Sequence, residues 1–137
     1  MDVKLHTCFV IVDDHEKAIA FYRDVLGFEV RTDVSYGGMR WVSVGSAAQP
    51  DVRILLEPPA AGPGISPSDR AAISDLLVKG LLRGVNLSTS DLEGIFDRVQ
   101  ASGADVVQEP MDMPYGTREF AVRDPAGNLI RFIQTKG

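Results

Sequence analysis

The fold is decided by the stretch His6–Val30, which reads HTCFVIVDDHEKAIAFYRDVLGFEV. It opens on an apolar run, Cys8–Val12, that ends at two aspartates. Apolar residues then recur at spacings of three and four, which predicts an amphipathic helix. These residues are Ala18, Ile19, Phe21, Tyr22, Val25 and Leu26. Gly27 ends the helical pattern, and the chain becomes extended again. The stretch therefore predicts a strand, a helix and a second strand in succession.

The first strand is predicted over Leu5–Val12, because both of its faces are mostly apolar. One face carries Thr7, Phe9 and Ile11, and the other carries Cys8, Val10 and Val12. A strand that is apolar on both sides is typical of the buried part of a sheet. We therefore expect a central, buried strand, followed by a helix that Asp13 or Asp14 caps.

Turn and breaker residues divide the rest of the chain into further elements. In the first half, the strands predicted are Phe28–Thr32, Arg40–Val44 and Val52–Glu57. Residues 58–66 are rich in Pro, Gly and Ala and predict a linker, and Pro67–Lys79 predicts a short helix. In the second half, the strands predicted are Leu82–Thr89, Asp105–Glu109, Thr117–Arg123 and Asn128–Gln134, with a helix over Leu92–Ala101.

The second half repeats the order of elements found in the first half. Asp14 and Asp91 precede the two helices, an offset of 91 − 14 = 77, and Gly27 and Gly103 follow them, an offset of 76. A shared order of elements at a near-constant offset indicates an internal repeat. The sequence thus predicts an α+β fold with two βαβββ modules in a single domain, 1–137. Module one covers about 3–57, the linker and short helix 58–81, and module two 82–135.

Composition excludes several classes of protein. The 137 residues carry a net charge of −5 with scattered basic residues, which disfavours a nucleic-acid partner. The single cysteine excludes an internal disulfide and a cysteine-rich zinc site. The longest apolar run falls well short of the ~20 residues that span a bilayer, and no signal peptide is recognised. We expect a cytoplasmic protein that does not associate with membranes.

Two motifs add to the repeated modules. Val12–Phe28 reads V-D-D-x-x-K-A-x-x-F-Y-x-x-x-L-G-F, and Asp124–Asn128 reads D-P-x-G-N. Together with the modules they resemble the vicinal oxygen chelate superfamily, the group of glyoxalases, bleomycin-resistance proteins and extradiol dioxygenases. The resemblance implies a curled, cup-like mixed sheet with the helices outside, a ligand inside the cup, and a homodimer. In the metal-dependent members, His or Glu side chains from the modules hold one divalent ion.

The family's metal-ligand positions carry unsuitable residues in this chain. Counted from the motifs, these positions fall on Thr7, Gly84, Arg131 and either Arg53 or Glu57. Of these, only Glu57 offers a ligand that divalent metals accept. His6 lies beside Thr7 but has the opposite parity, so it points to the other face of the strand. We therefore expect no metal cofactor, with one divalent ion held by His6 and Glu57 as the alternative.

Arginines in place of metal ligands predict a different pocket. A guanidinium pairs bidentately with carboxylate or phosphate, so Arg131 and Arg53 predict a site for a small anionic or aromatic ligand. The ligand-binding residues expected are Thr7, Phe9, Trp41, Arg53, Glu57, Tyr115 and Arg131. Alternatives stay open for several of them. Either guanidinium could lie in water with only its stem packed, Trp41 could be core, and Tyr115, in the loop 111–116, could seal a dimer instead.

Three functions follow from these residues. The first is a glyoxalase/bleomycin-resistance-like protein that binds a small molecule in a metal-free cup. The second is an enzyme of the superfamily, a lyase, isomerase or dioxygenase, with a non-standard metal site or metal-free acid–base chemistry. The third is a structural or partner-binding dimer. Whether the protein is an enzyme is left open, no catalytic residue is assigned, and the ligand is not identified by the sequence.

Overall fold

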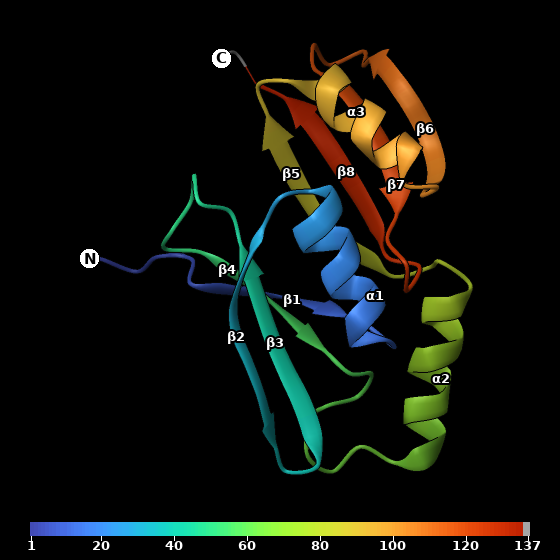
Figure 1. Ribbon diagram of the computed structural model, residues 1–137. Helices are drawn as coiled ribbons and strands as arrows, with labels where there is room; N and C mark the ends of the chain where they lie inside the picture. Colours follow the sequence, from blue (N-terminus) through green and yellow to red (C-terminus); the bar gives the residue numbers. More distant parts are fainter. Residues whose placement is uncertain (136–137) are drawn as a thin grey trace. The chain divides into compact units, whose positions relative to one another are not determined.

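The computed structural model describes residues 1–135 and divides into two compact units, Met1–Asp75 and a second that begins at Leu76. The first contains β1 (Thr7–Ile11), α1 (His15–Ile19), η1 (Ala20–Val25), β2 (Glu29–Tyr36), β3 (Met39–Gly45) and β4 (Arg53–Glu57). Helix α2 (Pro67–Val78) contains the boundary between the units. The second contains β5 (Arg83–Thr89), α3 (Leu92–Ala101), β6 (Asp105–Asp112), β7 (Arg118–Arg123) and β8 (Leu129–Gln134) (Figure 1). Within residues 1–135, no helix has the length and apolar character needed to cross a bilayer.

Unit 1 is a four-stranded sheet in the order β1-β4-β3-β2, with β1 parallel to β4 and the other pairs antiparallel. Its helical segment begins after Asp14, whose carboxylate accepts a hydrogen bond from the backbone N–H of Lys17. This cap satisfies one of the free donors at the helix start. The helix then widens into the π-helical segment η1, which carries the buried residues Phe21 and Tyr22.

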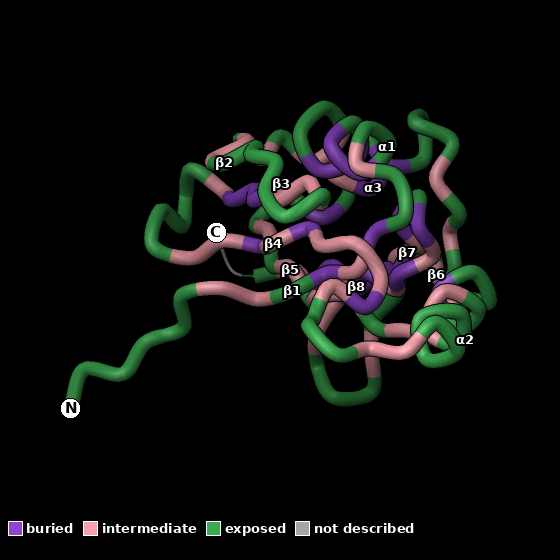
Figure 2. Tube along the Cα trace, turned by 90° about the horizontal axis from the view of Figure 1, so that it is seen from below, coloured by how far each residue is buried: buried purple, intermediate pink, exposed green. Residues whose placement is uncertain are grey.

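The core of unit 1 is made by one face of its sheet together with the helical segment. Its buried residues are Val10, Val12, Ala18, Ile19, Phe21, Tyr22, Val42, Val44, Ile54 and Leu56 (Figure 2). Val42 pairs with Leu56, and Val44 pairs with Ile54, so these side chains lie on the same side of the sheet. The opposite side therefore carries the residues of the other parity, of which Ser43 is buried and Phe9 and Val34 are exposed.

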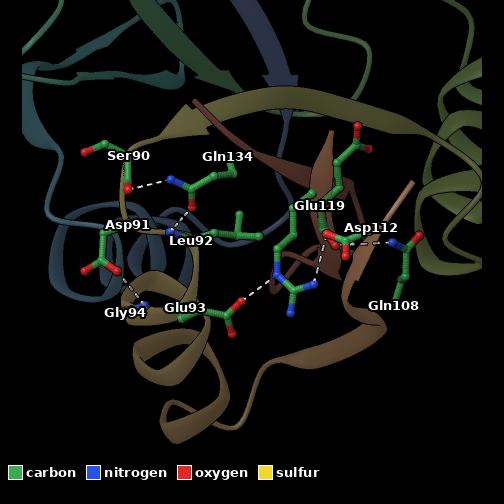
Figure 3. A network of polar contacts seen from close by, with 10 residues as sticks. Ser90, Asp91, Leu92, Glu93, Gly94, Gln108, Asp112, Glu119 and Gln134 are labelled. Carbon is green, nitrogen blue, oxygen red and sulfur yellow. Dashed lines mark hydrogen bonds and ion pairs between the residues drawn. The ribbon is translucent and has the colours of Figure 1, made fainter. Parts of the chain in front are cut away.

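Unit 2 repeats this design with the strand order β5-β8-β7-β6. Helix α3 begins at the cap Asp91, whose carboxylate accepts from the N–H of Gly94 (Figure 3). Its buried residues Leu92, Phe96 and Val99 belong to the same core as the sheet residues Phe120 and Phe132. The rings of Phe120 and Phe132 stack with centroids 4.5 Å apart. The α+β fold with two βαβββ modules is thus confirmed.

Three details of the strands differ from the prediction. Strand β1 is the edge strand of its sheet rather than a central one, and Phe9 on it is 60% exposed. Strands β2 and β6 are longer than expected, so Met111 belongs to β6 and not to a loop. The edge position of β1 and the greater lengths of β2 and β6 all arise from pairing between distant segments. Hydrophobic patterns within one strand do not report such pairing. The joint curling of both sheets into one cup stays a prediction.

The turn before β8 fixes where that strand begins. Asp124 is 4% exposed and its carboxylate accepts hydrogen bonds from the N–H groups of Ala126, Gly127 and Asn128. Gly127 has a φ of +111°, and a Cβ built on it would lie 2.4 Å from the carbonyl oxygen of Leu77. Only glycine suits this position, because both the backbone angle and the close approach exclude a side chain.

We predict that Gly127→Ala lowers the free energy of unfolding by about 2–5 kcal/mol, through backbone strain and the clash with Leu77. Gly103→Ala is the matched control, because Gly103 has a φ of +82° with no atom within 4 Å of its built Cβ. The control is expected to lose about 1 kcal/mol, the cost of the left-handed backbone alone. Urea unfolding of both variants measures the difference. Equal losses would contradict the close approach at Leu77.

Candidate functional site

The pairing of β1 with β4 places predicted site residues on one face of unit 1. Thr7 lies beside Arg53, Phe9 beside Leu55, and Ile11 beside Glu57. Paired residues in a ladder point to the same side of the sheet, and alternate residues share that side. Thr7, Phe9, Arg53 and Glu57 therefore share the face opposite the core. The prediction that Arg53 and Glu57 have the same parity agrees with this register.

Trp41 extends the same face across β3. Ser43 pairs with Leu55, and Trp41 lies two residues before Ser43, so both share the face of Phe9. Val34 on β2 is the partner of Trp41 and is 56% exposed. The Trp41 indole N–H donates to the carbonyl of Tyr36, at 3.3 Å. We call Thr7, Phe9, Val34, Trp41, Arg53, Leu55 and Glu57 the open face of unit 1. Ser43, which is 2% exposed and hydrogen-bonded to Thr32, lies near its centre. Besides Arg53 and Glu57 on β4, the face carries Glu29 and the guanidinium of Arg31, which lies over Gly45.

Arg53 is held by its backbone and not by its guanidinium. Its N–H donates to the carbonyl of His6 at 3.0 Å, and its carbonyl accepts from the Cys8 thiol at 3.8 Å. The Nε atom is buried and has no hydrogen-bond partner within residues 1–135. A buried donor without an acceptor is unusual in a folded protein and calls for an explanation. Arg53 is thus the polar group of the open face whose bonding is incomplete.

Glu57 is half-buried at the other end of β4, and burial raises the pKa of its carboxyl above the ordinary value. Glu57 lies four positions after Arg53 on the same strand, and four positions correspond to roughly 13 Å. The described residues show no ion pair between the two. Glu57 therefore does not neutralise Arg53.

The alternative metal pair, His6 and Glu57, is far apart in unit 1. Glu57 lies beside Ile11 of β1. Ile11 comes five positions after His6, which corresponds to roughly 16 Å along the strand. The His6 ring nitrogen Nδ1 lies 2.6 Å from the Thr7 hydroxyl. Ligands of one ion must each lie about 2 Å from it, which this separation does not allow. No group of three His, Cys, Asp or Glu side chains suited to a metal occurs within residues 1–135.

In unit 2, Arg131 belongs to a polar cluster centred on Glu119. Glu119 is 2% exposed, and its carboxylate accepts hydrogen bonds from the hydroxyls of Tyr115 and Thr117. The Arg131 Nη1 lies 3.4 Å from Glu119 Oε1 and 3.1 Å from the side-chain oxygen of Gln108. Buried carboxylates require this kind of pairing, because an isolated buried charge is strongly unfavourable. We call Gln108, Tyr115, Thr117, Glu119 and Arg131 the Glu119 cluster.

Gln108 joins the cluster through an irregularity in strand β6. The pairing of β6 with β7 shifts register on both sides of Gln108. Its amide nitrogen donates to the backbone carbonyl of Glu119 at 3.3 Å (Figure 3). Its side-chain oxygen accepts from Arg131. Sequence reasoning missed both Gln108 and Glu119. The alternation of β7 gives the parity of Glu119, but no local pattern gives the bulge that places Gln108.

The two arginines proposed for the pocket therefore differ in charge balance. Arg131 is paired with a buried carboxylate, whereas the guanidinium of Arg53 has no partner in the described part of the chain. The pairing of β5 with β8 shifts register between Arg83 and Asn86, on either side of Gly84. A Cβ added to Gly84 would point at the buried side chain of Ile130. Gly84 thus faces the core of unit 2 rather than the side that carries Arg131.

Tyr115 lies in the turn between β6 and β7, as predicted from its loop position. It is 68% exposed, yet its hydroxyl donates to Glu119 Oε1 at 3.1 Å. Shielding from water raises the pKa of its phenol, and the bond to the Glu119 carboxylate and that group's negative charge raise it further. The hydroxyls of Tyr115 and Thr117 thus tie this turn to Glu119.

The chain matches the Glyoxalase/Bleomycin resistance protein/Dioxygenase superfamily over residues 4–132. It belongs to this superfamily. The structure of UcmS2 superposes with a TM-score of 0.86 at 32% identity, covering 98% of this chain and 100% of that one. TnmS3, an antibiotic binding protein from Streptomyces sp. CB03234, gives a TM-score of 0.75 at 29% identity, with 98% of each chain covered. A probable lactoylglutathione lyase of Synechocystis sp. is 28% identical, over 96% of this chain and 94% of that protein. Similar members of the superfamily thus include a binding protein and a probable enzyme.

We predict that Glu119→Gln lowers the free energy of unfolding by about 2–4 kcal/mol, because Arg131 loses its charged partner in a buried setting. Glu93→Gln is the matched control. Glu93 pairs with Arg118 at 2.8 Å, but its side chain is 59% exposed (Figure 3). The control should cost less than about 1 kcal/mol. Urea unfolding of both variants tests this, and a loss no larger in Glu119→Gln than in Glu93→Gln would contradict the account of the cluster.

The raised pKa of Tyr115 predicts a pH effect in the alkaline range. The unfolded phenol loses its proton at lower pH than the folded one, so the stabilisation from Tyr115 is complete below the unfolded pKa. It is lost as pH rises through the folded pKa. In Glu119→Gln we expect the pKa of Tyr115 to move down, measured from near-ultraviolet phenolate absorbance as the difference between variants with Tyr115 and with Tyr115→Phe. An unchanged Tyr115 titration would show that Glu119 does not hold the phenol.

Proposed function

We propose that this protein binds a small aromatic or anionic molecule at the open face of unit 1 without a metal ion and without transforming it. The observation that carries the proposal is a sheet face on which large apolar side chains are left exposed on both edge strands, β1 and β2. Phe9 is 60% exposed and Val34 is 56% exposed, on the face that also carries Trp41. Aromatic side chains beside a few polar groups are typical of small-molecule sites. Trp41 and Phe9 offer flat surfaces on which a ligand ring can stack.

Two further observations support a metal-free binding function. The separation of His6 from Glu57 disfavours the metal pair that the sequence left open. TnmS3, with 29% identity over nearly all of this chain, is described as an antibiotic binding protein. An antibiotic or a similar small aromatic molecule is therefore the class of ligand we propose. Tyr115 and Arg131 stay predicted as further ligand contacts.

The second candidate function is an enzyme of the same superfamily. A specific observation favours it: burial raises the pKa of the Glu57 carboxyl, which is the direction of shift that a carboxyl group used for proton transfer needs. The 28% identity to a probable lactoylglutathione lyase points the same way. In this reading Glu57 is the general acid or base at the open face. A partner-binding dimer with no small-molecule ligand is the third candidate.

We also propose the setting in which the protein acts. A homodimer in the cytoplasm, with no nucleic-acid partner, accords with the net charge of −5 and the superfamily membership. Sedimentation of the purified protein tests the dimer directly, because a monomer at micromolar concentration would exclude it.

The binding proposal predicts that N-phenylnaphthylamine, a neutral aromatic probe, binds the protein and quenches the fluorescence of Trp41, the single tryptophan. Phe9→Ala should weaken this binding about tenfold, because an aromatic contact at the open face is lost. Val78→Ala is the control, because Val78 is 76% exposed on α2 and does not belong to the open face. Chelation with EDTA should leave the affinity unchanged, and the probe should be recovered intact.

Each alternative gives a different result in this experiment. Binding that disappears with EDTA, together with a stoichiometric metal in the purified protein, would support the metal enzyme. For the metal-free enzyme, a superfamily substrate such as a hemithioacetal of glutathione is added, and turnover that Glu57→Gln abolishes would support that reading. The absence of any binding by aromatic probes would favour the partner-binding dimer.

A further inference from the structure

The arginines of this chain are nearly all engaged. Those whose guanidinium holds a carboxylate or carbonyl oxygen are Arg23, Arg31, Arg40, Arg118, Arg123 and Arg131. Arg98 also has a partner. Arg70 and Arg83 are exposed, so water satisfies their donors. Arg53 is the half-buried arginine whose Nε is buried without a hydrogen-bond partner within residues 1–135.

The backbone holds Arg53 firmly, although its side chain has no partner. Strand β4 is an inner strand of the sheet, and Arg53 lies beside Thr7 of β1. The carbonyl of the preceding residue, Val52, accepts a hydrogen bond from Arg31, which also donates to the carbonyl of Ser46. Gly45 leaves the room for that guanidinium, because a Cβ there would overlap it. The start of β4 is thus anchored by an arginine that is itself fully occupied.

The location of Arg53 determines what could satisfy it. Its side chain lies on the open face, next to Thr7 and two strand positions from the level of Phe9. Among the carboxylates of this face, Glu57 is roughly 13 Å away along the strand, and Glu29 lies two strands away and is paired with Arg31. Neither pairs with Arg53, so a group that does so comes from outside unit 1, and it reaches the Nη atoms because the Nε is buried. An oxyanion next to an aromatic ring fits, because the guanidinium pairs with two oxygens while Phe9 contacts the ring.

We infer that Arg53 is the residue that selects for charge, and that the ligand carries an oxyanion, such as a carboxylate or sulfonate, on its aromatic frame. This inference rests on the proposed function and adds the chemical class of the ligand. Arg131 does not share this role, because Glu119 compensates its charge and Gln108 occupies the same nitrogen. Arg131 is a positioning residue of the Glu119 cluster. The open face thus distinguishes an anionic ligand from its neutral analogue through one side chain.

A matched pair of fluorescent probes tests the inference. Anilinonaphthalene sulfonate has the ring system of N-phenylnaphthylamine with a sulfonate added, so the two differ by the charged group. In Arg53→Met we expect the affinity for the sulfonate to fall about 10- to 100-fold. The affinity for the neutral probe should change less than about twofold, which also shows that the variant is folded. Arg53→Lys keeps the charge without the planar pair of donors and should lose an intermediate amount.

The control is Arg70→Met, which removes the same charge from an exposed position on α2 and should leave both affinities unchanged. Equal affinity of wild type and Arg53→Met for the sulfonate, with the neutral probe still bound, would overturn the inference alone. Loss of both probes in Arg53→Met but not in Arg53→Lys would also overturn it, because the residue would then be structural. Binding of neither probe to the wild type would overturn the proposed function itself.

Discussion

The buried carboxylate of Glu119, which is 2% exposed, is the main constraint on the polar contacts of unit 2. Buried charge is tolerated only when every oxygen finds donors. Two hydroxyls from the β6–β7 turn and one guanidinium from β8 converge on Glu119, which lies in β7. The requirement thus ties together three segments of unit 2. It also explains why Arg131, which looked from sequence like an unpaired cation, is part of a neutral pair.

The two units solve the same structural problem in opposite ways. Each has a βαβββ order and buries one face of a four-stranded sheet. Unit 2 fills its other face with paired polar groups. Unit 1 leaves apolar side chains exposed there, together with a guanidinium whose Nε is buried and unpartnered. Exposed apolar side chains and a buried donor without a partner cost stability, and a ligand that covers the apolar side chains would recover part of that cost. The difference between the units supports ligand binding on unit 1.

Much of the fold follows from local patterns. Helix α3 matches its predicted bounds, Leu92–Ala101, because cap, apolar spacing and glycine stop all lie within the segment. The position of β1 in its sheet does not follow, because strand pairing joins residues far apart in sequence. The candidate site likewise has features that follow from local sequence and features that depend on pairing between strands. Alternation places Arg53 and Glu57 on one face, but whether an arginine is paired depends on other strands. The bulges around Gln108 show this most clearly, since they set a contact that no spacing rule gives.

The central claim is that one arginine of the two is free to bind an anion. The most direct measurement is the nuclear magnetic resonance signal of the arginine Nε–H groups, followed as anilinonaphthalene sulfonate is added. Paired and unpaired guanidinium groups respond differently, because a new charge-assisted hydrogen bond to the Nη groups changes the electronic environment of the whole guanidinium, the buried Nε–H included. The account predicts a large, saturable shift of the Arg53 signal and little change at Arg131. A shift at Arg131 with none at Arg53 would contradict it.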